Sequence, residues 1–115
     1  MELDKLPVID WELGIKLAGR DKKLAEDILE ALIKTLPSEL STIKQLYNDQ
    51  NHLPLRQQIH KLYGAVCYCG TPRLKTVLAH LETDLKNNII TNLPSLFNQL
   101  DIEVGLLLEH YSHLH

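Results

Sequence analysis

Apolar residues recur at helical spacing along almost the whole chain, and this periodicity favours α-helices over any other element. The longest series has steps of three, four or one residues and comprises Leu24, Ile28, Leu29, Leu32, Ile33, Leu36, Leu40, Ile43 and Tyr47. Strand signals are nearly absent, and only the short β-branched run Ile89-Ile90-Thr91 is ambiguous. The sequence therefore predicts an all-α protein.

Helix start and stop signals divide the chain into five helices. Their expected bounds are Asp10 to about Gly19, near Asp21 to the turn at Asn51, Pro54 to about Cys69, Pro72 to about Lys86, and about Leu93 onward. Pro37 predicts a kink or a brief break in the second helix. Because the loops between the long helices are short, consecutive helices should be antiparallel. The prediction is one domain over residues 1–115, an antiparallel up-and-down four-helix bundle with a short additional N-terminal helix.

The charge balance argues against several classes of partner. The 115 residues carry a net charge of −3, so they offer no basic field for nucleic acid and no polybasic segment for a membrane surface. The apolar runs are far shorter than the ~20 residues of a transmembrane helix, and no signal peptide follows Met1. Cys67 and Cys69 would point to opposite sides of a helix, so we expect no disulfide between them and a reducing compartment.

A helical wheel of the third helix separates a core stripe from an exposed histidine. The stripe recurs at steps of four and three and consists of Leu55, Ile59, Leu62, Val66 and Cys69. His60 falls about 140° from the centre of this stripe, so we expect its side chain to face water. Its surface neighbours, three, four or seven residues away, are Arg56, Gln57, Tyr63, Gly64 and Cys67.

Gly64 lies one turn after His60, where a glycine lowers helix stability by about 1 kcal/mol relative to alanine. A helical side chain leans towards the N-terminus, so a side chain at position 64 would cover the ring of His60. We therefore interpret Gly64 as a gap that lets a large molecule reach the imidazole. The alternative interpretation is that Gly64 permits close packing of helices and that His60 is an ordinary surface residue.

The residues around His60 fit nucleophilic chemistry better than metal binding or hydrolysis. Only Cys67 is a further metal ligand on this face, and it lies about 10 Å along the helix axis. His110 and His113 are one turn apart near the end of the chain, where a frayed terminus explains them better than a metal site. No nucleophile–base–acid triad is recognisable. A histidine that is itself the nucleophile needs only a neutral ring nitrogen and access, and it could accept a phosphoryl group.

The run HKLYGAVCYCGTPRLKTVLAHLE, residues 60–82, resembles the signature of histidine-containing phosphotransfer (HPt) domains. The matching positions are His60, Gly64, Gly70, Leu74, Leu78, Leu81 and Glu82. The turn Tyr-x-Gly-x-Pro-Arg at residues 68–73 is similar to that of the C-terminal HPt domains of BarA/GacS/LetS-type tripartite hybrid sensor kinases. Residues 9–37 also look like the start of such a domain. The resemblance implies that the chain comes from the C-terminus of a longer kinase.

This resemblance implies a phosphorelay carrier without kinase activity of its own. His60 would accept a phosphoryl group from the aspartate of the receiver domain of the same hybrid kinase and pass it to the receiver domain of a response regulator. The domain itself would need no cofactor and no metal, because the receiver domain supplies the Mg²⁺. We expect a monomeric cytoplasmic domain, without membrane contact of its own, in a kinase anchored in the inner membrane.

Several residues are expected to support the histidine. Many members of the family have a lysine three residues after it, where this chain has Tyr63. Lys61 and Arg56 therefore remain as candidates for the positive charge near the phosphoryl group, and Tyr63 could donate its hydroxyl. The resemblance also suggests that a residue of the fourth helix, Glu82 or Lys86, approaches the imidazole.

The sequence also gives candidates for a docking surface and two alternative functions. We expect the docking surface to include exposed apolar residues of the second helix, with Ile33 and Leu40 as candidates. The alternative function is a purely structural interaction or dimerisation module, in which Gly64 merely lets helices pack closely. A four-helix metal protein is a third option, but the chain lacks the paired Glu-x-x-His motifs that such sites use.

Overall fold

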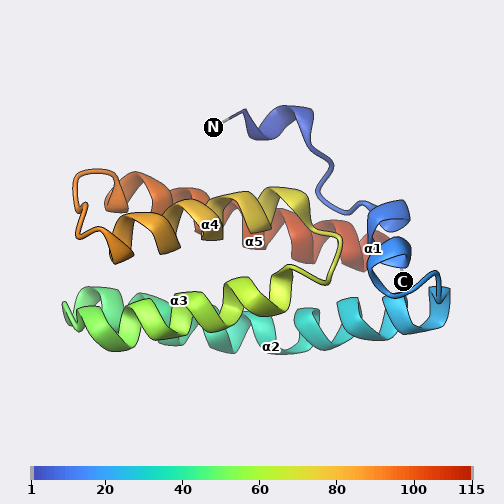
Figure 1. The fold of residues 1–115 in the computed structure, drawn as a ribbon, viewed down its shortest axis with the longest axis horizontal. Helices are drawn as coiled ribbons and strands as arrows, with labels where there is room; N and C mark the ends of the chain where they lie inside the picture. Colours follow the sequence, from blue (N-terminus) through green and yellow to red (C-terminus); the bar gives the residue numbers. More distant parts are fainter. Residues whose placement is uncertain (1, 115) are drawn as a thin grey trace.

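The computed structural model describes residues 2–114 as five α-helices and one short 3-10 helix, which confirms the all-α prediction. The elements are η1 Leu3–Lys5, α1 Trp11–Leu17, α2 Lys22–Asn48, α3 His52–Val66, α4 Pro72–Lys86 and α5 Leu93–Leu114. Helices α2 to α5 lie along the long axis of the molecule, and α1 packs at one end (Figure 1). Short turns join consecutive helices, so the predicted antiparallel four-helix bundle with an additional N-terminal helix is confirmed.

Aspartate N-caps form at the predicted starts of α1 and α2, because the first turn of a helix has N–H groups without partners in the helix. The Asp10 carboxylate accepts a hydrogen bond from the N–H of Leu13 at 3.0 Å. The Asp21 carboxylate accepts one from the N–H of Leu24, also at 3.0 Å. Gly19 follows α1 with a φ of +69°, a conformation that glycine adopts without steric cost. These signals place the bounds of α1 and the start of α2 correctly.

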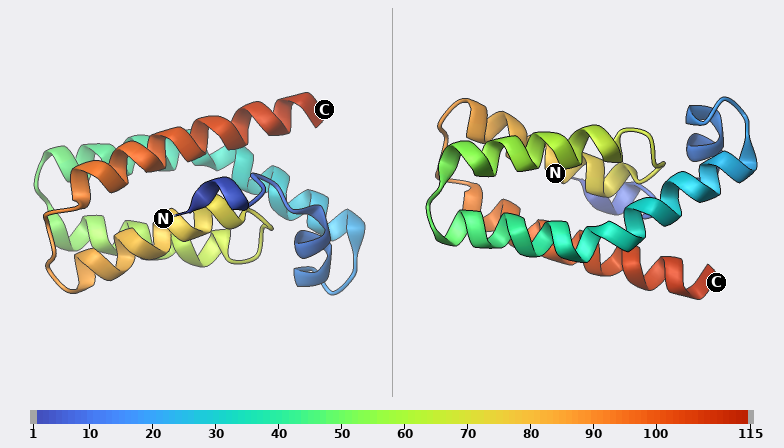
Figure 2. Two further views of the ribbon diagram at one scale, coloured as in Figure 1. Left: turned by 90° about the horizontal axis from the view of Figure 1, so that it is seen from above. Right: turned by 90° about the horizontal axis from the view of Figure 1, so that it is seen from below.

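The structure decides three local points and differs from the prediction at one of them, the end of the third helix. Helix α2 continues through Pro37 without a break and changes direction midway along its length (Figure 2, right). Helix α3 ends at Val66 rather than near Cys69, because the chain tightens there and the N–H of Cys69 bonds to the carbonyl of Val66 at 3.1 Å. The ambiguous run at residues 89–91 is neither strand nor helix but part of the loop between α4 and α5.

The core runs through the middle of the bundle and takes aliphatic side chains from all four long helices. The predicted stripe of the third helix is buried along its whole length, and α4 contributes the buried residues Leu74, Val77, Leu78, Leu81 and Leu85. Leu24 departs from the α2 series and is exposed, in the part of α2 that extends beyond α3 (Figure 1). Among residues 2–114, no helix combines the length and apolar character that a membrane-crossing segment needs.

A buried ion pair joins the first turn of α4 to α5. The Arg73 guanidinium donates two hydrogen bonds to the Glu103 carboxylate, Nε to Oε1 at 2.8 Å and Nη2 to Oε2 at 3.0 Å. The Gln99 amide donates a third to the same carboxylate at 2.8 Å. Glu103 is 1% exposed, and a carboxylate at that depth requires such partners to remain charged. The sequence analysis did not detect this pair, because its members are 30 residues apart.

The turn between α3 and α4 contacts α1 through backbone atoms. The N–H of Asp10 donates to the carbonyl of Gly70 at 2.8 Å. Gly70 has a φ of +67°, and a Cβ atom at this position would lie 2.7 Å from the Asp10 carbonyl oxygen and 2.8 Å from the nitrogen of Gly14. Only glycine therefore fits at position 70, for reasons of both backbone conformation and space. This contact fixes α1 across the end of the bundle.

Candidate functional site

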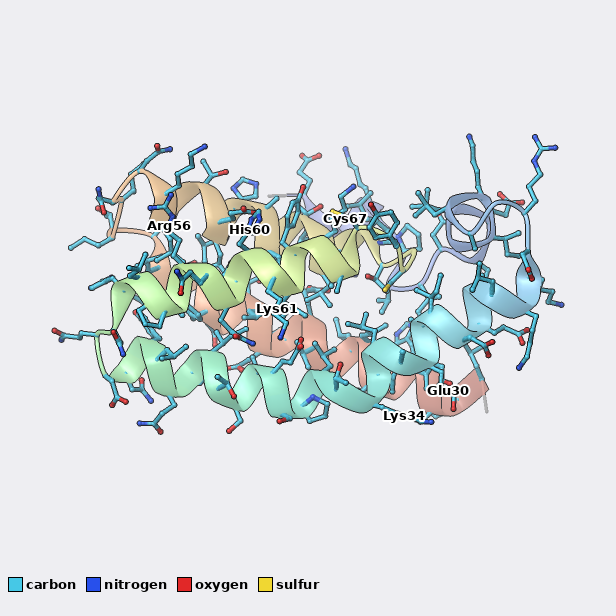
Figure 3. The ribbon with its side chains drawn as sticks, turned by 60° about the horizontal axis from the view of Figure 1, so that its bottom comes forward. Glu30, Lys34, Arg56, His60, Lys61 and Cys67 are labelled. Atoms are coloured by element: carbon cyan, nitrogen blue, oxygen red, sulfur yellow. The ribbon has the colours of Figure 1, made fainter. Side chains whose placement is uncertain are left out.

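His60 lies on the outer face of α3, about midway along the helix (Figure 3). Its side chain is 73% exposed, which confirms the prediction from the helical wheel. The neighbouring core residues Ile59 and Leu62 are almost completely buried, so they fix the rotation of α3 about its axis. The fold therefore holds the imidazole outward on a rigid helix rather than on a loop.

Glu82 of α4 contacts the imidazole of His60, as the family resemblance suggested. Its carboxylate Oε1 forms a hydrogen bond with Nδ1 of His60, and the contact becomes an ion pair when the ring is protonated. A carboxylate can only accept, so this bond places a proton on Nδ1. In the neutral ring the lone pair then lies on Nε2, which takes no part in this contact. The contact with Glu82 thus leaves Nε2 as the ring nitrogen with a free lone pair.

An open hollow of about 420 Å³ surrounds His60 between α3 and α4. It is lined by Leu53, Arg56, Gln57, His60, Glu82 and Lys86. The structure therefore brings together four of the predicted supporting residues, two of which are cations. The sequence analysis did not select Leu53, although it lies seven residues before His60 and hence on the same helical face. A leucine on the same predicted exposed face as His60 was the signal by which the sequence could have indicated Leu53.

Gly64 faces open space. A Cβ atom built at this position would meet no heavy atom within 4 Å outside the backbone of its own helix. Close packing against another helix therefore does not explain this glycine. The structure favours the interpretation that Gly64 leaves room beside His60 for a molecule from outside.

Comparison with known proteins shows the family to which this chain is similar. A family model described as Hpt domain matches residues 27–110, which span most of α2 and all of α3 and α4 and include His60. This chain belongs to the Hpt domain family. The match contains both helices that form the His60 hollow, so the site lies within the part that defines the family.

Curated relatives of this HPt domain are sensor kinases. The sensor histidine kinase GacS of Pseudomonas protegens is 35% identical over 105 residues, which are 90% of this chain and 11% of GacS. The signal transduction histidine-protein kinase BarA of Escherichia coli is 32% identical over 79 residues, which are 69% of this chain and 9% of BarA. The HPt domain thus spans about a tenth of the length of these relatives.

A solved structure supports the same family. The crystal structure of the HPT domain from the Hpt sensor hybrid histidine kinase from Shewanella superposes on this chain with a TM-score of 0.82. The two chains are 26% identical, and the match covers 93% of this chain and 92% of the other. The HPt fold therefore extends over nearly the whole chain.

Tyr63 stands where many HPt domains have a lysine, and its hydroxyl is occupied. A side-chain hydrogen bond with Cys67 raises the pKa of Tyr63, and the negative charge of Glu82 acts in the same direction. Tyr63 therefore stays neutral and adds no positive charge to the site. Cys67 is half-buried beside it, while burial raises the pKa of Cys69 to about 11, which keeps that thiol protonated and unreactive at neutral pH.

Six predicted residues do not line the His60 hollow: Tyr63, Gly64 and Cys67 follow His60 along the chain, and Lys61, Ile33 and Leu40 lie on other faces of α3 and α2. Lys61 lies on the side of α3 towards α2, because one residue along a helix turns the side chain by about 100° (Figure 3). Ile33 and Leu40 of α2 are half-buried and pack against the core. Part of each side chain stays accessible, and Leu40 lines a separate surface hollow with Pro37 and Lys44, so docking at these two residues stays a prediction.

Metal ligands do not gather in the described part of the chain. Among residues 2–114, no three His, Cys, Asp or Glu side chains lie close enough together to hold a metal ion. His110 and His113 are exposed near the end of α5. His60 offers an accessible imidazole beside two cations, Arg56 and Lys86.

Replacing Gly64 by alanine should separate stability from function. We expect Gly64→Ala to stabilise the domain by about 0.5–1 kcal/mol, because alanine favours the helix and the new Cβ meets nothing. The same methyl group should slow phosphoryl transfer from a receiver domain by roughly threefold to tenfold, because it crowds the approach to His60. Gly105→Ala in α5 is the matched control, since that glycine is also exposed and uncrowded. Equal transfer rates in thermally stabilised Gly64→Ala and in the control would contradict the role given to Gly64.

Proposed function

We propose that this HPt domain is a phosphorelay carrier in which His60 accepts a phosphoryl group from a receiver-domain aspartate and passes it to the aspartate of a response regulator. The observation that carries the proposal is the exposed imidazole with Nδ1 held by Glu82 and with open space at Gly64. The homology with hybrid sensor kinases supports the same function.

The transfer needs a nucleophile and no activating base. The lone pair of Nε2 attacks the phosphorus of the aspartyl phosphate, the new P–N bond forms, and the P–O bond to the aspartate carboxylate breaks. No proton leaves the imidazole, because Nδ1 keeps its hydrogen, and the ring becomes a cation. Glu82 accepts a hydrogen bond from that nitrogen and stabilises the positive charge. The second transfer, to the response regulator, is the reverse of the first.

The cations of the hollow balance the charge of the phosphoryl group. Arg56 lies one turn before His60 on α3, and Lys86 lies one turn after Glu82 on α4, and both line the hollow. Their side chains can reach the equatorial oxygens of the phosphoryl group from two sides. They take the role that Lys61 and Tyr63 do not fill.

The remaining components are assigned to the partners. The receiver domain of the same hybrid kinase is the donor, and it brings the acidic pocket and the Mg²⁺ that the in-line transfer requires. The HPt domain needs no cofactor of its own and acts as a monomer in the cytoplasm, while its parent kinase is anchored in the inner membrane.

Transfer of a labelled phosphoryl group tests the function. The domain is incubated with a ³²P-phosphorylated receiver domain and Mg²⁺, and the label on the HPt domain is followed over time. The expected product is a phosphohistidine, whose label is lost in acid and retained in base. Absence of label with each cognate receiver domain would favour the structural module instead.

Glu82 should act as a positioning residue. Glu82→Ala removes the acceptor from Nδ1, so we expect transfer to slow by about tenfold or more. Glu82→Gln keeps an acceptor without the negative charge and should fall between the wild type and Glu82→Ala. Nitrogen NMR of the His60 ring provides a readout apart from the rate, because the Nδ1–H tautomer should lose population in Glu82→Ala. An unchanged tautomer ratio would show that Glu82 does not select the nucleophilic nitrogen.

A further inference from the structure

Three exposed aliphatic side chains gather at the end of the bundle away from α1. Leu53 at the start of α3 is 63% exposed, and Ile89 and Ile90 of the α4–α5 loop are 41% and 66% exposed. All three line one hollow of about 310 Å³, together with residues of α3 and α4. We call these three side chains the end patch. The start of α3 and the α4–α5 loop lie at the same end of the bundle (Figure 1).

The backbone holds the two isoleucines in place. The N–H of Ile89 donates to the carbonyl of Asp84 at 2.8 Å, and the N–H of Leu93 donates to the carbonyl of Ile90 at 3.3 Å. A loop of this kind usually carries polar turn residues. Exposed aliphatic side chains that cluster on an ordered loop are instead typical of a contact surface.

The end patch is continuous with the His60 hollow. Leu53 and Arg56 line both hollows. Leu53 lies two helical turns before His60 on the same face, about 10 Å along the axis. A weak signalling interface buries up to ~600 Å² on each side, which corresponds to a radius of about 14 Å. A partner that places an aspartate on His60 therefore also covers Leu53.

We propose that the end patch is part of the docking surface for the receiver domain, an inference that rests on the proposed function. The charges favour this occupant, because Arg56 and Lys86 lie between the end patch and His60 and match the phosphorylated, acidic pocket that a receiver domain presents. On α2, Ile33 and Leu40 are half-buried against the core, and neither lines the His60 hollow.

The concentration dependence of transfer measures docking. We expect Leu53→Ser/Ile90→Ser to raise the receiver concentration that gives half-maximal transfer by about tenfold. The maximal rate at saturating receiver domain should remain within about twofold, because the patch does not touch the reacting atoms. Leu24→Ser/Ile102→Ser is the matched control, since these two side chains are 44% and 46% exposed and lie outside both hollows. The control variant should behave like the wild type.

Phosphoramidate separates docking from chemistry. This small donor passes its phosphoryl group to the imidazole and releases ammonia without any protein partner, so it should label the wild type and the patch variant equally. Failure to label the wild type would overturn the proposed function and the docking surface with it. Normal labelling together with an unchanged half-maximal receiver concentration would overturn the docking surface alone.

Two other outcomes would overturn the proposal: docking of the receiver domain at the other end of α3, and dimerisation through the end patch. Tyr68 is 62% exposed and lies about 12 Å beyond His60 in the opposite direction along the chain. If Tyr68→Ser, rather than the patch variant, raises the half-maximal concentration, the receiver docks at the other end and the proposal fails. If sedimentation shows a wild-type dimer that Leu53→Ser/Ile90→Ser dissociates, the end patch belongs to a second copy of this chain, which also overturns the proposal.

Discussion

Replacing His60 by glutamine is expected to abolish phosphoryl transfer from a receiver domain, with a loss of about a thousandfold or more in the rate of labelling. Glutamine resembles histidine in polarity but has no nucleophilic nitrogen. The side chain is 73% exposed and packs into no core, so the free energy of unfolding should change by less than about 1 kcal/mol. A loss of activity without a loss of stability would show that the imidazole itself carries the phosphoryl group.

His80→Gln is the control for this substitution. His80 is also an exposed histidine, and it lies on α4, but it does not line the His60 hollow. The label should therefore be unchanged in His80→Gln, and thermal unfolding should show both variants folded. If label of phosphohistidine character persisted on His60→Gln, the acceptor would be another residue of the domain.

Glu103→Ala is expected to cause the largest loss of stability. The substitution leaves the Arg73 guanidinium, whose side chain is 16% exposed, without its buried counter-charge. Breaking one side of a buried pair costs about 3–5 kcal/mol, which is a large part of the 5–15 kcal/mol that a domain of this size has. The melting temperature should fall by about 10–20 °C. Circular dichroism during thermal unfolding measures this change.

Two further variants serve as controls for Glu103→Ala, one at an exposed ion pair and one that removes both buried charges. Asp101→Ala breaks the exposed pair between Lys44 and Asp101, and it should cost less than about 1 kcal/mol. Arg73→Met/Glu103→Leu removes both buried charges and should recover most of the stability that Glu103→Ala loses. If Glu103→Ala were no worse than Asp101→Ala, the buried pair would not stabilise the contact between α4 and α5.

Features that depend on neighbours along the chain could be predicted from the sequence. The caps at Asp10 and Asp21, the stop at Gly19 and the exposure of His60 all follow from spacing within one helix. The interpretation of Gly64 as open space also needed only the geometry of α3. In each case the deciding contacts lie within one or two helical turns, where the period of 3.6 residues determines direction.

Features that depend on which helices are neighbours could not be predicted in the same way. Periodicity shows that Ile33 and Leu40 are apolar, but only the packing of α2 shows that they face the core. The contact of Glu82 with His60 joins residues 22 apart and was expected from family resemblance alone. The spacing to His60 could have indicated Leu53, but its neighbours Ile89 and Ile90 in one hollow lie more than 30 residues later in the chain.

The contact between α1 and the α3–α4 turn leaves no room for a side chain at position 70. The four long helices meet through side chains, so a loss of volume at one position can be offset by a gain at another. Where α1 contacts the turn between α3 and α4, backbone packs directly against backbone. A methyl group at position 70 would lie only 2.7 Å from the carbonyl oxygen of Asp10. Successive substitutions can therefore change the core of the bundle gradually. A single substitution at Gly70, in contrast, would disrupt the attachment of α1 at once.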